Sequence, residues 1–280
     1  MDANRYPLSL VLFYIFVTEE KEIATVRYML NCVGIPESSV PVLKVFAHRS
    51  YFVHRTRPVL KISVNFVRLF LSEELPSSIS KVLWLDSDII VQRDIKELWD
   101  SYLTKESEFT VAGASRTIPV GRLPGDRTGE EYPAMYQDRY GKPFKGTGAD
   151  FNAGVMLINL EHMRKDDGYL LKEMIWWMER NEEKMLWWRG SQPLANLLAL
   201  ISPAGTYEIL APTWNVYLQG AKADPNRGWH SESGILHWAS EHTVKPWEHN
   251  LSDPEIELWL PHGLSVMKCV RAVQPPRVYL

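Results

Sequence analysis

The chain has 280 residues, and 45% of them are hydrophobic, so it is long enough to bury a sizeable core and disorder is not expected. The 31 Lys and Arg residues face 34 Asp and Glu residues, for a formal net charge of −3. This balance argues against nucleic acid as a main partner, because phosphate binding needs concentrated basic surface. No apolar run reaches the roughly 18 residues of a membrane-spanning helix, so we expect no membrane span.

The first apolar run covers residues 8–17 (LSLVLFYIFV) and has the length and composition of a strand buried on both faces. Thr18 is expected to cap a helix that continues to about Asn31, with acidic residues in its first turn. Residues 40–46 predict the next strand. Residues 65–75 predict a helix that ends before a proline.

Residues 81–85 (KVLWL) predict a third buried strand, and the sequence Asp-Ser-Asp at 86–88 follows it directly. A short strand at 89–91 comes next. A helix containing IKELWD then opens with a capping-box pattern, and a strand covers residues 109–114. Strands that alternate with helices favour a doubly wound α/β sheet, and such sheets bind ligands beyond the carboxyl ends of their strands. Residues 86–88 lie at such a place.

Residues 115–150 are rich in Gly, Pro and charge and lack a clear period, so we expect a long loop, either a lid or acceptor-binding loop or a disordered insertion. A strand at 151–160 and helices at 169–180 and 191–200 follow. The sequence after Ile209 is expected to be loop-rich up to a strand at 234–238. We expect one domain over residues 1–261 and a C-terminal tail over residues 262–280.

Asp86 and Asp88 are the first candidate site. Two carboxylates at positions i and i+2 can turn toward one ion if the chain bends there, and their hard oxygen atoms suit Mg²⁺ or Mn²⁺. The alternative is an ordinary polar turn after a strand. Carboxylates between two apolar segments are costly unless they bind something, which favours the metal site.

The sequence GILHWASEHTVKPW (234–247) holds the second candidate site. His237 follows an apolar run, and a neutral imidazole is a common metal ligand. Lys245 lies at a Lys-Pro-Trp corner, where its positive charge is suited to binding an anionic ligand. The alternatives are a packed histidine and a surface lysine, and His242 and His249 lie nearby, so composition alone does not select His237.

Three blocks in order carry a resemblance: VLWLDSDIIVQRDIKELWD, then FNAGVMLINL, then LHW with a later VKPW. Together they resemble glycosyltransferase family 8, from about residue 8 to residue 247. The resemblance implies a fold of the GT-A type, that is, an α/β, Rossmann-like, mostly parallel sheet with helices on both faces. In that family a first strand and helix precede the strand that 8–17 matches, so we expect this fold to lack the first β-α unit.

The resemblance implies a retaining, metal-dependent transfer of a sugar from a UDP-sugar donor to a hydroxyl of a carbohydrate acceptor. Asp86, Asp88 and His237 match the ligands of Mn²⁺, with Mg²⁺ as the alternative ion, and Asp88 is expected to be essential for catalysis. Family members in plants usually face the Golgi lumen behind an N-terminal anchor. We therefore expect the Golgi lumen if such an anchor exists and the cytoplasm otherwise.

Four further residues match donor-binding positions of the family. Arg68 and Asn152 match contacts to the donor and its sugar, and Lys245 matches a lysine on the diphosphate. Gln192 matches a glutamine near the anomeric carbon, where it would orient the donor and stabilise positive charge through its amide oxygen. Each has a structural alternative: Arg68 on a helix surface, Asn152 at a strand-edge turn, Lys245 on the surface and Gln192 as a polar residue at a helix N-terminus.

Two departures from the family concern these positions. Ser191 stands where many members have an aspartate before the glutamine. The spacing from His237 to Lys245 is longer than usual, and Ser240 replaces a common glycine, so we expect a bulged loop there.

Two other functions remain open from the sequence. A degenerate glycosyltransferase would bind nucleotide or glycan without turnover. A phosphatase of the haloacid-dehalogenase type also has Asp-x-Asp after a strand, but Ile90 stands where that class usually has Thr or Val. The two cysteines, Cys32 and Cys269, form neither a disulfide framework nor a thiolate metal site and leave the redox compartment open. The donor sugar, the acceptor and the oligomeric state are also open.

Overall fold

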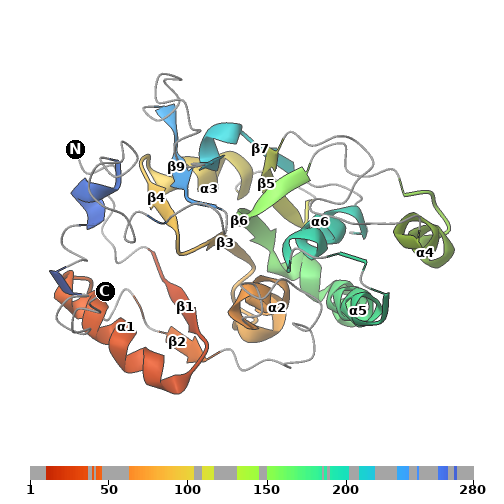
Figure 1. Ribbon diagram of the computed structural model, residues 1–280, viewed down its shortest axis with the longest axis horizontal. Helices are drawn as coiled ribbons and strands as arrows, with labels where there is room; N and C mark the ends of the chain where they lie inside the picture. Colours follow the sequence, from red (N-terminus) through yellow and green to blue (C-terminus); the bar gives the residue numbers. More distant parts are fainter. Residues whose placement is uncertain are drawn as a thin grey trace, which may run out of the picture. The chain divides into compact units, whose positions relative to one another are not determined.

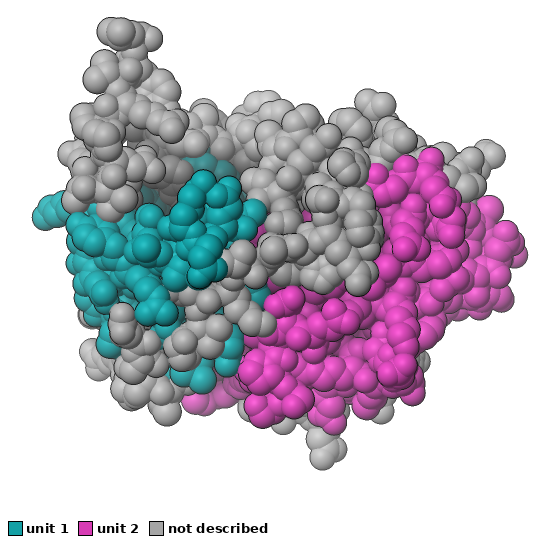
Figure 2. All heavy atoms as spheres, turned by 90° about the horizontal axis from the view of Figure 1, so that it is seen from below, with its two compact units in different colours: residues 1–47, 88–94, 216–280 teal, residues 48–87, 95–215 magenta. Residues whose placement is uncertain are grey.

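A computed structural model describes residues 11–36, 40, 42–45, 63–103, 109–116, 131–144, 150–184, 186–187, 190–201, 208–217, 232–239, 245, 258–263 and 268–269. The chain forms two compact units (Figure 2). Unit 1 consists of Met1–Ala47, Asp88–Asp94 and Val216–Leu280, and unit 2 consists of His48–Ser87 and Ile95–Asn215. Both units combine helices with strands, which confirms the expected α/β class (Figure 1). The boundary expected at residue 261 stays a prediction.

The helices are α1 (Glu20–Cys32), α2 (Val67–Glu74), α3 (Ile95–Leu103), α4 (Glu131–Tyr140), α5 (Leu160–Lys184) and α6 (Gln192–Ile201), with the 3-10 turns η5 (Ser63–Phe66) and η6 (Pro212–Trp214). The strands are β1 (Tyr14–Val17), β2 (Val42–Val45), β3 (Lys81–Leu85), β4 (Ile89–Val91), β5 (Val111–Arg116), β6 (Asp150–Asn159), β7 (Glu208–Leu210), β8 (Val216–Tyr217) and β9 (Ile235–His237).

Unit 2 is built on a four-stranded sheet in the order β3-β6-β5-β7. Strand β6 is antiparallel to both β3 and β5, and β7 runs parallel to β5, so the sheet is mixed in direction. Residues Phe151 to Asn159 of β6 are all buried, which agrees with the mostly apolar sequence of this strand. Helices α5 and α6 contact this sheet, and α2 contacts α5.

The C-terminal end of α2 is held by Arg164 from α5. Its guanidinium donates hydrogen bonds to the carbonyl oxygens of Ser72 at 3.0 Å, Leu75 at 3.1 Å and Ile79 at 2.6 Å. The last carbonyls of a helix have no partner within the helix, so this arginine supplies the missing donors. It thereby holds the segment that leads into β3, the strand that Asp86 directly follows.

Unit 1 contains a parallel pair, β1-β2, and a three-stranded sheet in the order β4-β9-β8. Strand β9 is antiparallel to β4 and parallel to β8, and the register places Ile89 opposite His237. Ile90 of β4, Leu236 of β9 and Trp238 form a buried cluster, and Leu258 and Trp259 pack against it. His237 therefore lies on a strand that is fixed on both sides.

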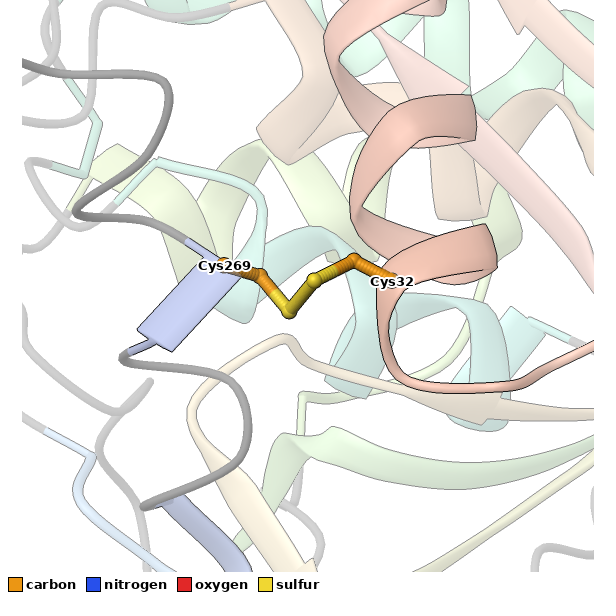
Figure 3. The surroundings of a disulfide bond; sticks show 2 residues. All are labelled: Cys32 and Cys269. Atoms are coloured by element: carbon orange, nitrogen blue, oxygen red, sulfur yellow. A yellow bond between two sulfur atoms is a disulfide. The ribbon is translucent and has the colours of Figure 1, made fainter.

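Cys32, at the end of α1, forms a disulfide bond with Cys269, with a Cα–Cα distance of 5.9 Å (Figure 3). Both cysteines belong to unit 1, in its first and last chain segments. The sequence did not predict this bond, because the partners are 237 positions apart and follow no spacing pattern. The bond joins the C-terminal segment, which was expected to be a tail, to α1.

Several expected elements differ from the observed ones. The N-cap of α1 is Glu19 rather than Thr18: Glu19 and Glu22 form a capping box, and the backbone N–H of Thr18 donates to the Glu22 side chain at 2.8 Å. The strand expected at 8–17 begins at Tyr14 among the described residues, and the expectation that both faces are buried is wrong, since only Val17 of β1 is fully buried. The helix expected at 65–75 consists of η5 followed by α2.

The long loop expected at 115–150 contains a helix, α4, and the loop-rich stretch expected after Ile209 contains η6 and β8. The helix expected at 169–180 is part of the longer α5, which is interrupted at Lys165–Gly168, where three successive residues have left-handed backbone angles. No helix in the described part of the chain has the length and apolar character needed to cross a membrane.

Candidate functional site

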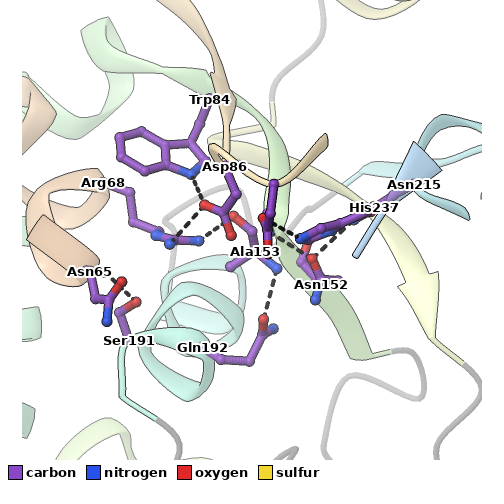
Figure 4. Close-up of polar contacts among 12 residues, drawn as sticks. Asn65, Arg68, Trp84, Asp86, Asn152, Ala153, Ser191, Gln192, Asn215 and His237 are labelled. Atoms are coloured by element: carbon purple, nitrogen blue, oxygen red, sulfur yellow. Dashed lines mark hydrogen bonds and ion pairs between the residues drawn. The ribbon is translucent and has the colours of Figure 1, made fainter. Parts of the chain in front are cut away.

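Asp86 follows the last residue of β3, and its backbone N–H donates to the carbonyl of Gly154 on β6 at 2.8 Å. Its Oδ1 accepts a hydrogen bond from Trp84 Nε1 at 2.8 Å and forms an ion pair with Arg68 Nη2 at 3.0 Å (Figure 4). The carboxylate is therefore held by two donors from its own unit. Trp84 was not predicted as a site residue.

Arg68 comes from α2 and is buried, with only 8% of its side chain exposed. Besides Asp86 it contacts the carbonyl oxygen of Ala153, and its guanidinium carbon lies 4.9 Å from the centroid of the Trp84 ring. Its Nε is buried without a hydrogen-bond partner among the described residues. Burying an arginine in this way is costly unless it is paired, so the contact with Asp86 accounts for its position. The alternative of a helix-surface arginine is wrong.

Asp88, in unit 1, lies immediately before β4, and its carboxylate has two basic neighbours. Its Oδ1 lies 3.1 Å from Nε2 of His237, and its Oδ2 accepts a hydrogen bond from Nζ of Lys245 at 2.5 Å. The Lys245 ammonium also contacts the carbonyl of Trp238. The backbone is joined here too, because Trp238 N–H donates to the Asp88 carbonyl at 3.0 Å. The structure thus brings together Asp88, His237 and Lys245 within unit 1.

Burial of Asp88 would raise the pKa of its carboxyl group, because the charged form loses water. The hydrogen bond and charge of His237, followed by those of Lys245, outweigh burial and lower this pKa to about 2. Asp88 is therefore ionised at neutral pH. An ionised carboxylate is the protonation state that a carboxylate metal ligand needs.

Gln192 binds the backbone near the start of β6, on either side of Asn152. Gln192, the first residue of α6, accepts a hydrogen bond on Oε1 from the N–H of Ala153 at 2.8 Å, and its Nε2 donates to the carbonyl of Phe151. Its amide group therefore bridges the backbone on both sides of Asn152. Its expected role at an anomeric carbon stays a prediction.

Asn152 is buried, and its Oδ1 accepts hydrogen bonds from Gly154 N–H at 2.7 Å and from Asn215 Nδ2 at 3.1 Å (Figure 4). Asn215 follows η6 and was not predicted as a site residue, since a lone asparagine in a loop-rich stretch has no distinguishing pattern. Ser191, at the position where many family members have aspartate, donates from Oγ to the carbonyl of Asn65 at 2.5 Å and so joins the turn before α6 to η5.

The sequence-predicted site residues thus fall into two groups, one within each unit. Unit 2 holds Arg68, Asp86, Asn152 and Gln192 along β3, β6 and the start of α6. Unit 1 holds Asp88, His237 and Lys245. Ser87 is the only residue between Asp86 and Asp88 in the sequence. Ser240, His242 and His249, which bear on the expected bulge and on the choice of His237, lie outside the described residues.

Residues 15–250 match the family described as Glycosyl transferase family 8. Glycosyltransferase 8 domain-containing protein 2 of Macaca fascicularis is 30% identical over 205 residues, which cover 69% of this chain and 56% of that protein. Probable galacturonosyltransferase-like 10 of Arabidopsis thaliana is 30% identical over 222 residues, which cover 74% of this chain and 55% of that protein. The chain thus spans about half the length of these relatives.

Among solved structures, an active-site mutant of LgtC is similar with a TM-score of 0.58 and 16% sequence identity, over 95% of this chain and 87% of that one. At this level of identity the likeness concerns the fold. It confirms the expected fold of the GT-A type, with the mixed strand directions described above.

Proposed function

Since the chain belongs to glycosyltransferase family 8, we propose that it transfers a glycosyl group from a UDP-sugar to a hydroxyl of a carbohydrate acceptor and retains the α configuration. The observation that carries the proposal is the carboxylate of Asp88, which lies 3.1 Å from the His237 imidazole and 2.5 Å from the Lys245 ammonium. Asp88 and His237 could bind a metal ion, and the Lys245 ammonium lies next to them. This arrangement suits a diphosphate, because diphosphates are bound through a metal ion and through positively charged side chains.

Asp86, Asp88 and His237 are the side chains that would hold a divalent cation. Two carboxylates and one imidazole nitrogen fit Mn²⁺ or Mg²⁺, because hard oxygen ligands dominate the set. The ionised state of Asp88 at neutral pH is compatible with the same role, since a carboxylate ligand must be deprotonated. A bound cation supplies Lewis-acid stabilisation of the negative charge that builds on the departing UDP.

Lys245 would add a second positive charge at the diphosphate. One unit charge at about 4 Å, at an effective dielectric constant near 20, is worth about 4 kcal/mol, which corresponds to nearly a thousandfold in rate. Lys245 is partly exposed and bound to Asp88, so part of this charge is already screened and engaged. We therefore expect Lys245 to contribute less than the metal ligands do.

Arg68, Asn152 and Gln192 would complete the donor site from unit 2. Arg68 fixes the carboxylate of Asp86, and Asn152 would contact the donor sugar. Gln192 holds the strand on which Asn152 lies. A direct action of Gln192 on the anomeric carbon requires its oxygen to serve a second partner besides the Ala153 N–H.

A screen of UDP-sugars with Mn²⁺, measured as UDP release, tests the proposal. The wild-type chain should release UDP from at least one donor, and Asp88→Ala should lower the rate by about a thousandfold. Asp100→Ala is the matched control, because Asp100 is a partly exposed aspartate paired with Lys96 on α3, and it should keep the wild-type rate.

Two other outcomes would identify the competing functions. Calorimetric binding of Mn²⁺ and UDP without release from any donor would indicate a degenerate glycosyltransferase. Release of phosphate from a phosphomonoester, lost in Asp86→Ala, would indicate a phosphatase.

We further propose that the protein works in an oxidising compartment such as the Golgi lumen. The Cys32–Cys269 disulfide supports this, because disulfides are rare in proteins of the reducing cytosol. Alkylation of free thiols in a freshly quenched cell extract tests it. Both cysteines should react only after reduction, whereas labelling of the unreduced protein would favour the cytoplasm.

A further inference from the structure

We propose that Asn215, for which the sequence pattern predicted no role, is a positioning residue that orients the side-chain amide of Asn152 toward the donor sugar. The proposal rests on the proposed function, since it assumes that a sugar binds at Asn152. Its basis is a set of hydrogen bonds within unit 2 that leaves the Asn152 amide a single orientation.

Asn152 and Asn215 are both buried, with 8% and 5% of their surface exposed. Nδ2 of Asn215 donates to Oδ1 of Asn152 at 3.1 Å and lies 3.5 Å from the backbone carbonyl oxygen of the same residue. The N–H of Gly154 donates to the same Oδ1 at 2.7 Å. Two donors from different chain segments therefore converge on one side-chain oxygen.

These partners decide which end of each amide is oxygen. A backbone N–H only donates, so the Asn152 atom facing Gly154 must be oxygen. A backbone carbonyl only accepts, so the Asn215 atom facing the carbonyl of Asn152 must be nitrogen. Reversing either amide would place two donors or two acceptors against each other. The assignment follows from the partners and does not depend on distinguishing oxygen from nitrogen directly.

A chemical preference follows for the ligand of Asn152. Its oxygen accepts from Gly154 and Asn215, so the group that we propose for the contact with a sugar is its NH₂, which can donate two hydrogen bonds. Its partner on the sugar must then be an acceptor oxygen, either of a hydroxyl or of a carboxylate. Asn215 acts on this contact only through Asn152.

The backbone of Asn152 is fixed separately. Gln192 accepts from the N–H of Ala153 and donates to the carbonyl of Phe151, the residues on either side of Asn152. Gln192 therefore holds the strand while Asn215 holds the side chain. Loss of Asn215 should leave the strand in place and release the rotation of the amide.

The substitution Asn152→Asp tests the orientation directly. The carboxylate can still accept from Gly154 and Asn215, so the fold should be kept, but the NH₂ group is gone. We expect the affinity for UDP, measured by calorimetry with Mn²⁺, to stay within about twofold of wild type. The affinity for the UDP-sugar that the wild-type chain hydrolyses fastest should fall about tenfold. Equal affinity of both proteins for that UDP-sugar would overturn the proposal.

A double-mutant cycle tests whether Asn215 acts through Asn152. Asn215→Ala should lower kcat/KM about fivefold to tenfold and leave UDP affinity unchanged. Adding it to Asn152→Ala should cost less than a further twofold. Losses that multiply in the double variant, or an equal loss of UDP and UDP-sugar affinity in Asn215→Ala, would overturn the role assigned to Asn215.

Asn181→Ala is the matched control for general damage to unit 2. Asn181 is a buried asparagine whose Oδ1 accepts from the N–H of Trp187 at 2.7 Å, and it belongs to α5 rather than to the site. Its loss should lower the melting temperature without a selective loss of UDP-sugar affinity. If the wild-type chain turns over no UDP-sugar, the proposed function fails and this inference falls with it. If the wild type is active and the cycle is additive, only the inference fails.

Discussion

Arg68 Nη2 lies 3.0 Å from Asp86 Oδ1, in an ion pair in which 8% of the arginine side chain and 26% of the aspartate side chain are exposed. The pair is reinforced by Trp84, which donates to the same oxygen and stacks against the guanidinium. A ligating carboxylate that is hydrogen-bonded from behind is held in a fixed orientation, which strengthens metal binding. Arg68 thus acts on the proposed metal site through Asp86.

Arg68→Met should therefore weaken Mn²⁺ binding by about tenfold or more, because partners of metal ligands typically contribute that much to affinity. Titration calorimetry with Mn²⁺ measures the effect. Arg180→Met is the control, since Arg180 pairs with Glu183 on a partly exposed face of α5 and should leave Mn²⁺ affinity unchanged. An unaltered Mn²⁺ affinity in Arg68→Met would contradict the positioning of Asp86 by Arg68.

Gly113→Ala should destabilise unit 2 at the strand that holds Asn152. A Cβ at position 113 would lie 2.3 Å from the Phe151 ring, and overpacking of a well-packed core costs about 1–3 kcal/mol or more. We expect a lower midpoint in denaturant unfolding together with a lower kcat, since Phe151 precedes Asn152. Combining the change with Phe151→Leu should recover part of the stability. A double variant less stable than Gly113→Ala would rule out this clash as the cause.

The strand at Lys81–Leu85 and its acidic end could be predicted because a short run of apolar residues was followed at once by paired carboxylates. Helix α4 could not. Its sequence, EYPAMYQDRY, has a proline in its first turn and few aliphatic residues, and its tertiary contacts include the bonds of Arg139 and Tyr140 to Glu173. Such contacts override local propensity and are invisible in a single sequence.

The candidate site likewise contains residues that could be predicted from the sequence and residues that could not. Asp86, Asp88 and His237 lie in recognisable motifs at strand ends. Trp84 had the pattern of a core residue in an apolar strand, and Asn215 follows a 3-10 turn beside a strand of only two residues, too short to show a period. The positions of both depend on pairing between segments far apart in the chain, which periodicity does not report.

Asp166→Gly should stabilise the protein, whereas the same substitution at Asp138 should destabilise it. Asp166 has φ 51° and ψ 45°, in the left-handed region that costs a side chain energy, and glycine removes that cost. Asp138 lies within α4, where glycine is unfavourable. We expect a gain of a few tenths to about 1 kcal/mol at position 166 and a loss of about 0.5 kcal/mol at position 138. Thermal unfolding measures both, and a shared sign would refute the argument.

Glu173 should make the docking of α4 on α5 depend on pH. Burial would raise the pKa of its carboxyl group, but the paired hydrogen bonds from Arg139, each 2.6 Å long, and the one from Tyr140 lower it below the ordinary 4.5. A carboxyl group with a lowered folded-state pKa stabilises the fold above its unfolded pKa and loses that contribution as the pH falls through the folded value.

Glu173→Gln is the matching variant, because it keeps the shape of the side chain and removes its charge. The unfolding free energy of the wild type should exceed that of Glu173→Gln at pH 7, and the difference should shrink as the pH is lowered below about 4.5. Urea unfolding of both proteins at a series of pH values measures it. A difference that stays constant down to pH values well below 4.5, or that grows as the pH falls, would show that the charge of Glu173 does not hold α4 in place.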